Sequence, residues 1–446
     1  MQSLKNRSLI VFAAMCMLVL SVGNIESAAG ASVADLAGTW NFCSFVSGPG
    51  APWWERLTMT IQPNGKFTGS GTESPNGTDK FSGSFLLLSS GAFEITSAGR
   101  NLGLCQMDLG KTVMACTSTW NDKSGTADLI IGTKQAASYS KADLAGKWQG
   151  NFLLSPGPFW IRTDETIKSN GEFTAPLTFS EGPGGSIYGT LSISPSGEIT
   201  DSTCHGAYCP ESNYATYMDA GKTVIVGTDG ASTKTDTAAL TVYTKMASSY
   251  SMYDLVGIWH ANILASGPGA PWWERATVTI KPDGTFSVSG VENNGSSDSG
   301  KGTLSISSAG VITVKGVKSS DLGMVMNAGK TVMVETNTWS GKTDPGTTEI
   351  GIWTKSAGLP GAPTEVSAKA GNAQAKVSFT APAANGSAIT SYTVTPSVGA
   401  AVKGESSPIT VKGLTNGKSY TFTVTATNGI GTGLPSKASK AIIPEK

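Results

Sequence analysis

Short stretches of alternating apolar and polar residues dominate the chain. From Ala276 to Ile280 every second residue is apolar, a Pro-Asp-Gly turn follows at 282–284, and the alternation resumes at Phe286. This period is typical of a strand with one buried face, and turn residues between two such runs indicate a β-hairpin. The pattern returns twice more within 303–336. It predicts an antiparallel, all-β protein with no helix of ordinary length.

Three copies of one module make up most of the chain. The hexapeptides DLAGTW, DLAGKW and DLVGIW end at Trp40, Trp148 and Trp259, which are 108 and 111 residues apart. Copies one and three also share the decapeptide SGPGAPWWER, at 47–56 and 266–275. A regular repeat of this length predicts tandem meanders of about eight strands and about 105 residues each. The expected bounds are 32–135, 140–245 and 251–355.

Each module opens with a helical-turn signal and a Gly-x-Trp strand. Ser32, Ser140 and Ser251 each stand three residues before an Asp, which is the spacing of a capping box. A helical turn, a Gly-x-Trp strand and an eight-stranded meander resemble the calycin group of β-barrels, which includes lipocalins and avidins. The resemblance implies that the Trp closes one end of a barrel and that an Arg packs over it. The Arg residues that recur in all three copies are Arg56, Arg162 and Arg275.

A single six-bladed β-propeller, with two four-stranded blades from each module, is the alternative architecture. The number of strands does not separate the two. The linkers at 135–142 and 246–253 are rich in Ala, Ser and Tyr, as is typical of spacers between closed units. We therefore expect three tandem calycin-like barrels.

The C-terminal part of the chain has a different pattern. After a Gly/Pro-rich linker at 356–362, residues 363–446 are similar to a fibronectin type III domain of the bacterial type, through VSFTAPAANGSAITSYTVTP at 377–396 and LTNGKSYTFTVTATNGIGTGLPS at 414–436. Tyr420 matches the tyrosine-corner position of such domains. The resemblance implies a seven-stranded, Ig-like β-sandwich that serves as a spacer or an adhesion module.

The first 29 residues have the pattern of a secretory signal peptide. Lys5 and Arg7 precede an apolar run from Leu9 to Val22, and small residues follow it. No later run is long enough to span a membrane. We therefore expect a mature chain that is secreted or held at the cell surface, with the periplasm as an alternative.

The charge pattern limits the partners. The 446 residues include 32 basic and 32 acidic ones, and no run of like charge occurs. Nucleic acid is therefore not an expected partner, because its recognition requires a basic patch. A neutral carbohydrate or a cell-surface protein is expected instead.

Five cysteines follow the signal peptide, so at least one remains unpaired within the chain. Cys204 and Cys209 bracket a short loop and are the easiest pair. Cys105 and Cys116 flank a hairpin turn around Gly110 and would be diagonal neighbours if the turn were centred on residues 109–110. Cys43 is then a competing partner for either of them.

The duplicated decapeptide holds the candidate binding residues. Adjacent Trp residues in a strand point to opposite faces, so one indole can be buried while the other is exposed. Aromatic anchors dominate many interfaces, and an exposed indole can stack on a sugar ring. The alternative is that both indoles only cap the barrel. The candidate residues are Trp53, Trp54, Glu55, Arg56, Trp160, Arg162, Trp272, Trp273, Glu274 and Arg275.

Enzymatic chemistry has little support in the sequence. Neither of the two histidines, His205 and His260, sits beside a plausible combination of nucleophile and acid. A glycoside hydrolase needs two facing carboxylates, and Glu55, Glu165 and Glu274 would have to supply them. We expect a non-catalytic binding protein without a cofactor or a bound metal. A glycan hydrolase on a propeller and a structural cell-surface spacer are the alternatives.

Overall fold

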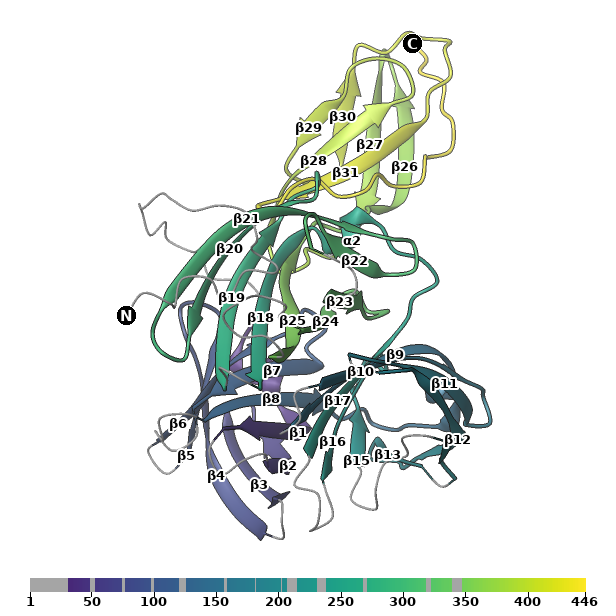
Figure 1. The fold of residues 1–446 in the computed structure, drawn as a ribbon. Helices are drawn as coiled ribbons and strands as arrows, with labels where there is room; N and C mark the ends of the chain where they lie inside the picture. The colour runs from purple at the N-terminus through teal and green to yellow at the C-terminus, as the bar shows by residue number, and fades with distance from the viewer. Residues whose placement is uncertain are drawn as a thin grey trace. The chain divides into compact units, whose positions relative to one another are not determined.

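The computed structural model confirms the all-β fold and the barrel architecture (Figure 1). Residues 31–356 form one compact unit and residues 357–446 form a second. In the described part of the chain, no helix is long and apolar enough to cross a membrane. The expected signal peptide lies outside the described residues. These are 31–48, 53–73, 77–97, 100–119, 126–155, 159–180, 182–201, 203–206, 215–230, 238–267, 271–317, 322–338 and 347–446.

Barrel 1 is a closed meander of eight antiparallel strands. A single 3-10 turn, η1 (Val33–Leu36), leads into it. The strands are β1 (Gly38–Ser47), β2 (Trp53–Ile61), β3 (Lys66–Glu73), β4 (Gly77–Leu87), β5 (Phe93–Ser97), β6 (Arg100–Met107), β7 (Val113–Ser118) and β8 (Ala127–Lys134). The barrel closes because β8 pairs with β1.

Barrel 2 has the same order of strands with one short addition. Its elements are α1 (Lys141–Leu144), β9 (Gly146–Ser155), β10 (Phe159–Ile167), β11 (Glu172–Phe179), β12 (Gly185–Ile193), β13 (Glu198–Asp201), β14 (His205–Gly206), β15 (Ala215–Met218), β16 (Val224–Gly230) and β17 (Ala238–Lys245). Pairing of β11 with β12 and of β17 with β9 completes the ring. The extra strand, β14, pairs with β12.

Barrel 3 is again a closed ring of eight strands. Its elements are α2 (Met252–Leu255), β18 (Gly257–Ser266), β19 (Trp272–Ile280), β20 (Thr285–Glu292), β21 (Ser297–Ile306), β22 (Val311–Val314), β23 (Leu322–Met326), β24 (Val332–Thr338) and β25 (Thr348–Gly358). The propeller alternative is therefore wrong, because each module closes on itself and does not split into two open blades.

The Gly-x-Trp tryptophans close one end of each barrel. Trp40 is fully buried, and its indole Nε1 donates to the carbonyl oxygen of Leu36, 2.7 Å away. The cation over this ring is Lys134, which pairs with Trp40 across β1 and β8 and places Nζ 5.8 Å from the ring centre. Arg56 pairs instead with Cys43, three residues farther along β1. Placing an Arg over this Trp is wrong for Arg162 and Arg275 too, because Lys245 lies over Trp148 and Lys355 over Trp259.

A shared apolar core joins the three barrels. Leu129, Leu240 and Ile350 stand at equivalent positions of β8, β17 and β25, and all three are fully buried in one cluster that draws on every barrel. These strands face a barrel interior on one side and the neighbouring barrels on the other. Burial of one such side chain is worth about 1.5–3 kcal/mol. The barrels are therefore stabilised as a set.

Equivalent hairpin turns of the three barrels meet at the Trp40 end. Each turn has the sequence Asp/Asn-x-Gly-Lys-Thr, and the carboxylate of Asp108 accepts hydrogen bonds from the backbone N–H groups of its own turn. Each turn also contacts the next barrel, so that the three links close a ring. The linked pairs are Thr331 with Asp108, Thr112 with Asp219, and Asn327 with Thr223.

Equivalent serines meet at the opposite end of the shared core. The Ser266 hydroxyl lies 3.0 Å from the Ser155 hydroxyl and 3.3 Å from that of Ser47. One serine comes from each barrel, and all three are buried. Both ends of the shared core are therefore closed by hydrogen bonds between barrels.

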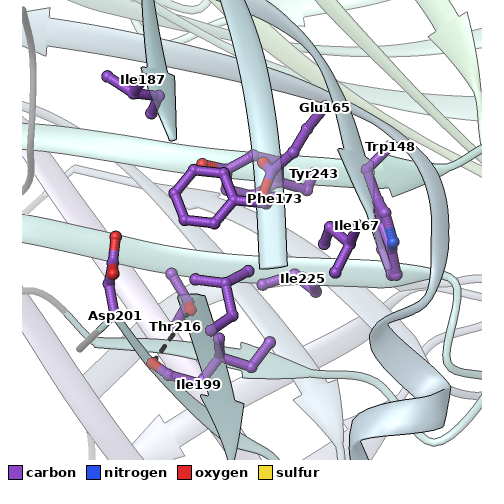
Figure 2. Close-up of a pocket in the computed structure, with 11 residues that line it drawn as sticks. Trp148, Glu165, Ile167, Phe173, Ile187, Ile199, Asp201, Thr216, Ile225 and Tyr243 are labelled. Atoms are coloured by element: carbon purple, nitrogen blue, oxygen red, sulfur yellow. Dashed lines mark hydrogen bonds between the residues drawn. The ribbon is translucent and has the colours of Figure 1, made fainter. Parts of the chain in front are cut away.

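Each barrel interior contains buried carboxylic acids. Asp128 in barrel 1 accepts a hydrogen bond from the Ser44 hydroxyl at 2.7 Å, and burial raises its pKa to about 7. Glu335 in barrel 3 accepts one from the Trp353 indole at 2.9 Å, and burial also raises its pKa to about 7. In barrel 2, Glu165 lines an internal pocket (Figure 2).

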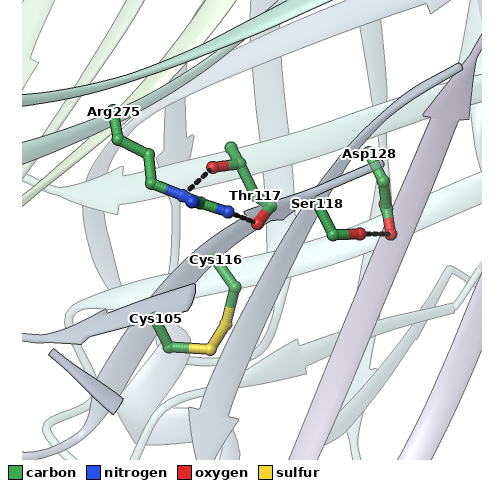
Figure 3. Close-up of a disulfide and its surroundings, with 6 residues drawn as sticks. All are labelled: Cys105, Cys116, Thr117, Ser118, Asp128 and Arg275. Carbon is green, nitrogen blue, oxygen red and sulfur yellow. Dashed lines mark hydrogen bonds between the residues drawn. A yellow bond between two sulfur atoms is a disulfide. The ribbon is translucent and has the colours of Figure 1, made fainter. Parts of the chain in front are cut away.

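One disulfide lies inside barrel 1 and joins Cys105 to Cys116 (Figure 3). The two residues face each other directly across β6 and β7. The expectation of a diagonal pair is wrong because the turn is centred between residues 110 and 111, one residue later than assumed. Cys43 is free and buried against barrel 2, and burial raises its pKa to about 12. Cys204 is disulfide-bonded, and Cys209 lies outside the described residues.

The second unit is a sandwich of two three-stranded sheets. The Tyr420 hydroxyl accepts a hydrogen bond from the Thr415 N–H at 3.0 Å, which confirms the tyrosine corner. An irregular segment takes the place of a seventh strand: the Ser436 N–H donates to the carbonyl of Val424, whose own N–H donates to the Ser436 hydroxyl. The strands are β26 (Thr364–Gly371), β27 (Gln374–Thr380), β30 (Ile409–Lys412), β29 (Val402–Gly404), β28 (Ile389–Pro396) and β31 (Phe422–Asn428).

The ring of turns predicts a strong response to Asn327→Asp. Asp219 already has a pKa raised to about 6 by burial, and Asp108 contributes repulsion. A third carboxylate would add repulsion and remove the amide that donates to Thr223. We expect a loss of about 1–3 kcal/mol in the free energy of unfolding, measured by urea denaturation. An unchanged midpoint at pH 8 would contradict the ring, and Asn327→Ala separates loss of the donor from repulsion.

The buried acids predict a fall in stability between about pH 4.5 and pH 7. The folded-state pKa values of Asp128 and Glu335 lie above their ordinary ones, so the stability they give is complete below the ordinary pKa, is lost progressively as the pH rises to the folded value of about 7, and changes little above it. Each acid should cost about 1 kcal/mol for each pH unit within this interval. Thermal unfolding of Glu335→Gln should show a weaker pH dependence than the natural chain. An equal slope would contradict the assignment.

Candidate functional site

In each barrel, the tryptophan two residues before the repeated arginine stacks on that arginine, which lies on the same strand. Residues two apart in a strand share a face, so Trp54 and Arg56 point out of barrel 1 together, with the guanidinium carbon 4.0 Å from the ring centre. The same distance, from guanidinium carbon to ring centre, is 3.6 Å for Arg162 over Trp160 and 4.1 Å for Arg275 over Trp273.

Each of these arginines crosses to the next barrel. Arg56 of barrel 1 donates from Nε to the Thr228 hydroxyl of barrel 2 at 2.9 Å and from Nη2 to the Thr228 carbonyl at 2.5 Å. Arg162 makes the same two bonds to Thr336 of barrel 3, at 2.7 and 2.6 Å. Arg275 makes them to Thr117 of barrel 1 (Figure 3). The three arginines therefore join the barrels in a closed cycle.

Burial changes the role expected of the tryptophans. Trp54, Trp160 and Trp273 are 7%, 4% and 8% exposed. The indole N–H groups of Trp160 and Trp273 donate to threonines of the neighbouring barrels, Thr338 and Thr119. These indoles fill the interfaces between neighbouring barrels, which we call seams, and they are not presented as stacking surfaces.

The remaining candidates of the decapeptide have other surroundings. Trp272 is 7% exposed and belongs to the core of barrel 3, whereas Trp53 is half-buried. Glu55 and Glu274 lie on β2 and β19, each opposite another glutamate, Glu73 or Glu292, on the adjacent strand. The Pro/Gly-rich residues 49–52 and 268–270 lie outside the described residues.

Burial also shifts the pKa values of the arginines. Desolvation lowers the pKa of Arg275 to about 10, and it lowers that of Arg56 as well. Both groups stay charged at neutral pH, so each needs the hydrogen bonds from the next barrel. Sequence analysis found these arginines but not their threonine partners. Arg275 and Thr117 lie on different barrels, 158 positions apart, and no sequence pattern indicates that they meet.

A polar groove lies at the seam between barrels 1 and 2. Its empty volume, counted with its opening, is about 900 Å³, and Tyr217 of barrel 2 lines it together with residues of β2, β3 and β4. The strand register arranges the barrel 1 residues in two rows. The rows are Arg56, Thr72 and Thr78, and then Thr58, Ser70 and Lys80.

The groove is specific to this seam. Gln106 and Val325 stand at the positions of barrels 1 and 3 that are equivalent to Tyr217, and Ser299 stands in barrel 3 where barrel 1 has Lys80. Sequence analysis missed Lys80 and Tyr217 because their proximity depends on strand register and on packing between barrels. Aligning the repeats does expose both as departures from their equivalents.

No group of three metal-ligating side chains occurs within the part of the chain that the structure describes. The carboxylates considered for a hydrolase are divided among the barrels: Glu55 lies in barrel 1, Glu165 in barrel 2 and Glu274 in barrel 3.

The seam predicts the effect of Arg275→Ala. The change removes the stacking on Trp273 and leaves the fully buried Thr117 without its partner. We expect a loss of about 2–4 kcal/mol in the free energy of unfolding. Urea unfolding monitored by tryptophan fluorescence measures this loss. Arg275→Lys should recover only part of it, because an ammonium group lacks the planar fork. Lys281→Ala, at an exposed residue just after β19, is the control, and equal losses in both variants would contradict the role of the arginine.

Residues 361–442 match the family model of the fibronectin type III domain. The C-terminal domain is thus a fibronectin type III domain, as its sequence predicted. No curated protein sequence matches this chain significantly.

Comparison with solved structures gives matches of very low similarity. Transferrin binding protein B from Haemophilus parasuis is 6% identical, with 72% of this chain and 76% of that chain covered and a TM-score of 0.25. A DUF3598-family protein of unknown function from Nostoc punctiforme is 11% identical, with 73% and 100% covered and a TM-score of 0.18. Titin domains A168–A170 are 12% identical, with 68% and 100% covered and a TM-score of 0.19. No inference is drawn from likeness at this level.

Proposed function

We propose that this chain is an exported, non-catalytic binding protein that holds an acidic carbohydrate in the groove between barrels 1 and 2. The fibronectin type III domain would then serve as its spacer. The proposal places the ligand beside Arg56 and not on an exposed indole. It moves the expected binding residues from the tryptophan loops to the groove.

The two rows of polar residues across β2, β3 and β4 carry the proposal. Thr58, Ser70, Thr72 and Thr78 offer hydroxyl groups on neighbouring strands, where opposed side chains are about 5 Å apart. Such a grid suits a ligand with many hydroxyl groups. The aromatic ring of Tyr217, which is half-buried, forms part of the wall and offers an apolar face to a sugar ring.

The charges of the groove favour an acidic sugar. Arg56 and Lys80 lie at opposite ends of the two rows, and Lys80 is exposed. Arg56 already donates Nε and Nη2 to Thr228, so it contributes its positive charge to the groove, and the flexible ammonium group of Lys80 is the one that can contact a ligand carboxylate directly. No Asp or Glu is among the residues that line the groove, and the two carboxylates that interact with Arg56, which are Glu198 and Asp229 of barrel 2, lie behind its lining. A uronic acid or a sialic acid unit therefore fits better than a neutral sugar.

A structural spacer is the second candidate. It is favoured by the burial of Trp54, Trp160 and Trp273 between barrels, which gives the repeated loops a purely architectural use. We do not propose a hydrolase, since Glu55, Glu165 and Glu274 belong to different barrels and none of them lines the groove.

The groove predicts a specific loss of binding in Lys80→Ser and Tyr217→Gln. Each variant introduces the residue of an equivalent position in another barrel, so the fold should be retained. A glycan array should first show binding of the mature chain to uronic or sialic acid saccharides, and calorimetry should then show at least about tenfold weaker binding for each variant.

The matched control is Lys301→Ser, which removes an exposed lysine from barrel 3 and should leave affinity unchanged. Unchanged affinity in the Lys80→Ser, Tyr217→Gln double variant would overturn the groove assignment. Failure of the natural chain to bind any acidic saccharide would favour the spacer.

A further inference from the structure

Barrel 2 buries a glutamate where the other barrels bury an apolar residue. Glu165 lies three residues after Arg162 on β10, and the equivalent residues after Arg56 and Arg275 are Met59 and Val278. Met59 is 3% and Val278 is 1% exposed, and both belong to the cores of their barrels. Glu165 is equally deep, at 4% exposed.

A second acid replaces an apolar residue in the same barrel. Asp201 stands four residues after the turn glycine Gly197, and Ile95 and Val314 hold the equivalent positions after Gly91 and Gly310. Ile95 and Val314 are buried, and Asp201 is half-buried. Two acids have therefore entered one barrel interior at positions where its neighbours are filled by apolar side chains.

The two acids line a common pocket inside barrel 2. Figure 2 shows Glu165 and Asp201 projecting from different strands into the space between them. The Thr203 N–H donates to Asp201 at 3.0 Å, but the side-chain carboxyl group of Glu165 has no hydrogen bond or ion pair within the described structure. A buried carboxyl group without a partner in the protein is costly, and a ligand can supply that partner.

The rest of the pocket is aromatic and aliphatic. Trp148, which already carries Lys245 over its ring, Phe173 and Tyr243 contribute rings, and isoleucine and leucine side chains with Thr216 complete the wall. No Lys or Arg is among the lining residues. Aromatic faces attract cations, and an apolar wall accommodates alkyl groups. An aromatic cage with a carboxylate is therefore suited to a positive charge that carries carbon substituents.

We propose that barrel 2 binds a small organic cation of the alkylammonium class, with its charge on Glu165 and Asp201 and its alkyl groups against the aromatic rings. This site is distinct from the groove in position and in the charge of its ligand. The groove is cationic and lies between barrels, whereas the pocket is acidic and lies within one barrel.

The charge state of the pocket gives the binding a pH dependence. Burial, with repulsion from Asp201, raises the pKa of Glu165 to about 8, and burial also raises the pKa of Asp201. The other titratable groups that face these acids are Tyr243 on β17 and His205 on β14. A bound cation must displace the proton of Glu165, so affinity should rise between pH 6 and pH 8.5 and binding should release a proton.

Calorimetric titration of the mature chain with methylammonium, trimethylammonium and tetramethylammonium chloride tests the proposal. We expect saturable binding at millimolar or lower concentration, with heats that depend on the ionisation enthalpy of the buffer because a proton is released. Glu165→Met, which introduces the residue of barrel 1, should weaken binding at least about a hundredfold while raising the unfolding temperature. Glu165→Gln keeps the shape and should also abolish binding.

The control variant is Glu172→Gln, which removes an exposed carboxylate on β11 that pairs with Lys168 and should change nothing. Equal binding by Glu165→Met and the natural chain would overturn the proposal. Absence of any alkylammonium binding at 50 mM and pH 8.5, or binding of Ca²⁺ alone, would overturn it too. Saccharide binding should survive Glu165→Met, and alkylammonium binding should survive Lys80→Ser, so the two sites fail separately.

Discussion

The rest of this structure depends on the burial of three guanidinium groups between barrels. A charged group removed from water must be given hydrogen bonds, and each arginine donates two of them to a threonine of the next barrel. Each barrel therefore depends on its neighbour to help satisfy its own arginine. The cycle from barrel 1 to barrel 2, then to barrel 3 and back, satisfies all three at once, and the apolar cluster between the barrels adds a non-directional term that reinforces it.

Much of the fold could be predicted from the sequence because local chemistry specifies it. The alternation around Ala276 predicted hairpins, the Ser-x-x-Asp signals predicted the capped turns, and the fibronectin type III segment matched its family over most of its length. The interface between barrels was missed. Strands such as β8 and β25 are buried almost throughout, so their apolar residues do not follow the period of two that a one-sided strand would have.

The site was harder to predict for a different reason. The duplicated decapeptide attracted attention as a binding loop, yet Trp54 and Trp273 serve the seams between barrels. The tryptophan and arginine recur in every copy because each barrel uses the same pair of side chains to contact the next barrel in the cycle. Departures from the repeat are the better guide to binding: Lys80, Tyr217 and Glu165 all differ from their equivalents. Only the structure shows which of these lie together.

The closed cycle has a consequence for the order of the chain. Barrel 3 contacts barrel 1 through Arg275 and through the Leu109 N–H, which donates to the carbonyl of Lys355. No linker joins these two barrels, yet their seam resembles the two seams that a linker crosses. The linker from Lys134 to Ser140 spans one such seam with five residues between them. By the same geometry, a linker of that length could join the end of barrel 3 to the start of barrel 1. The new chain termini could then be placed at either of the two natural linkers between barrels. The architecture is therefore that of a circularly permutable ring, and any one of the three barrels could come first.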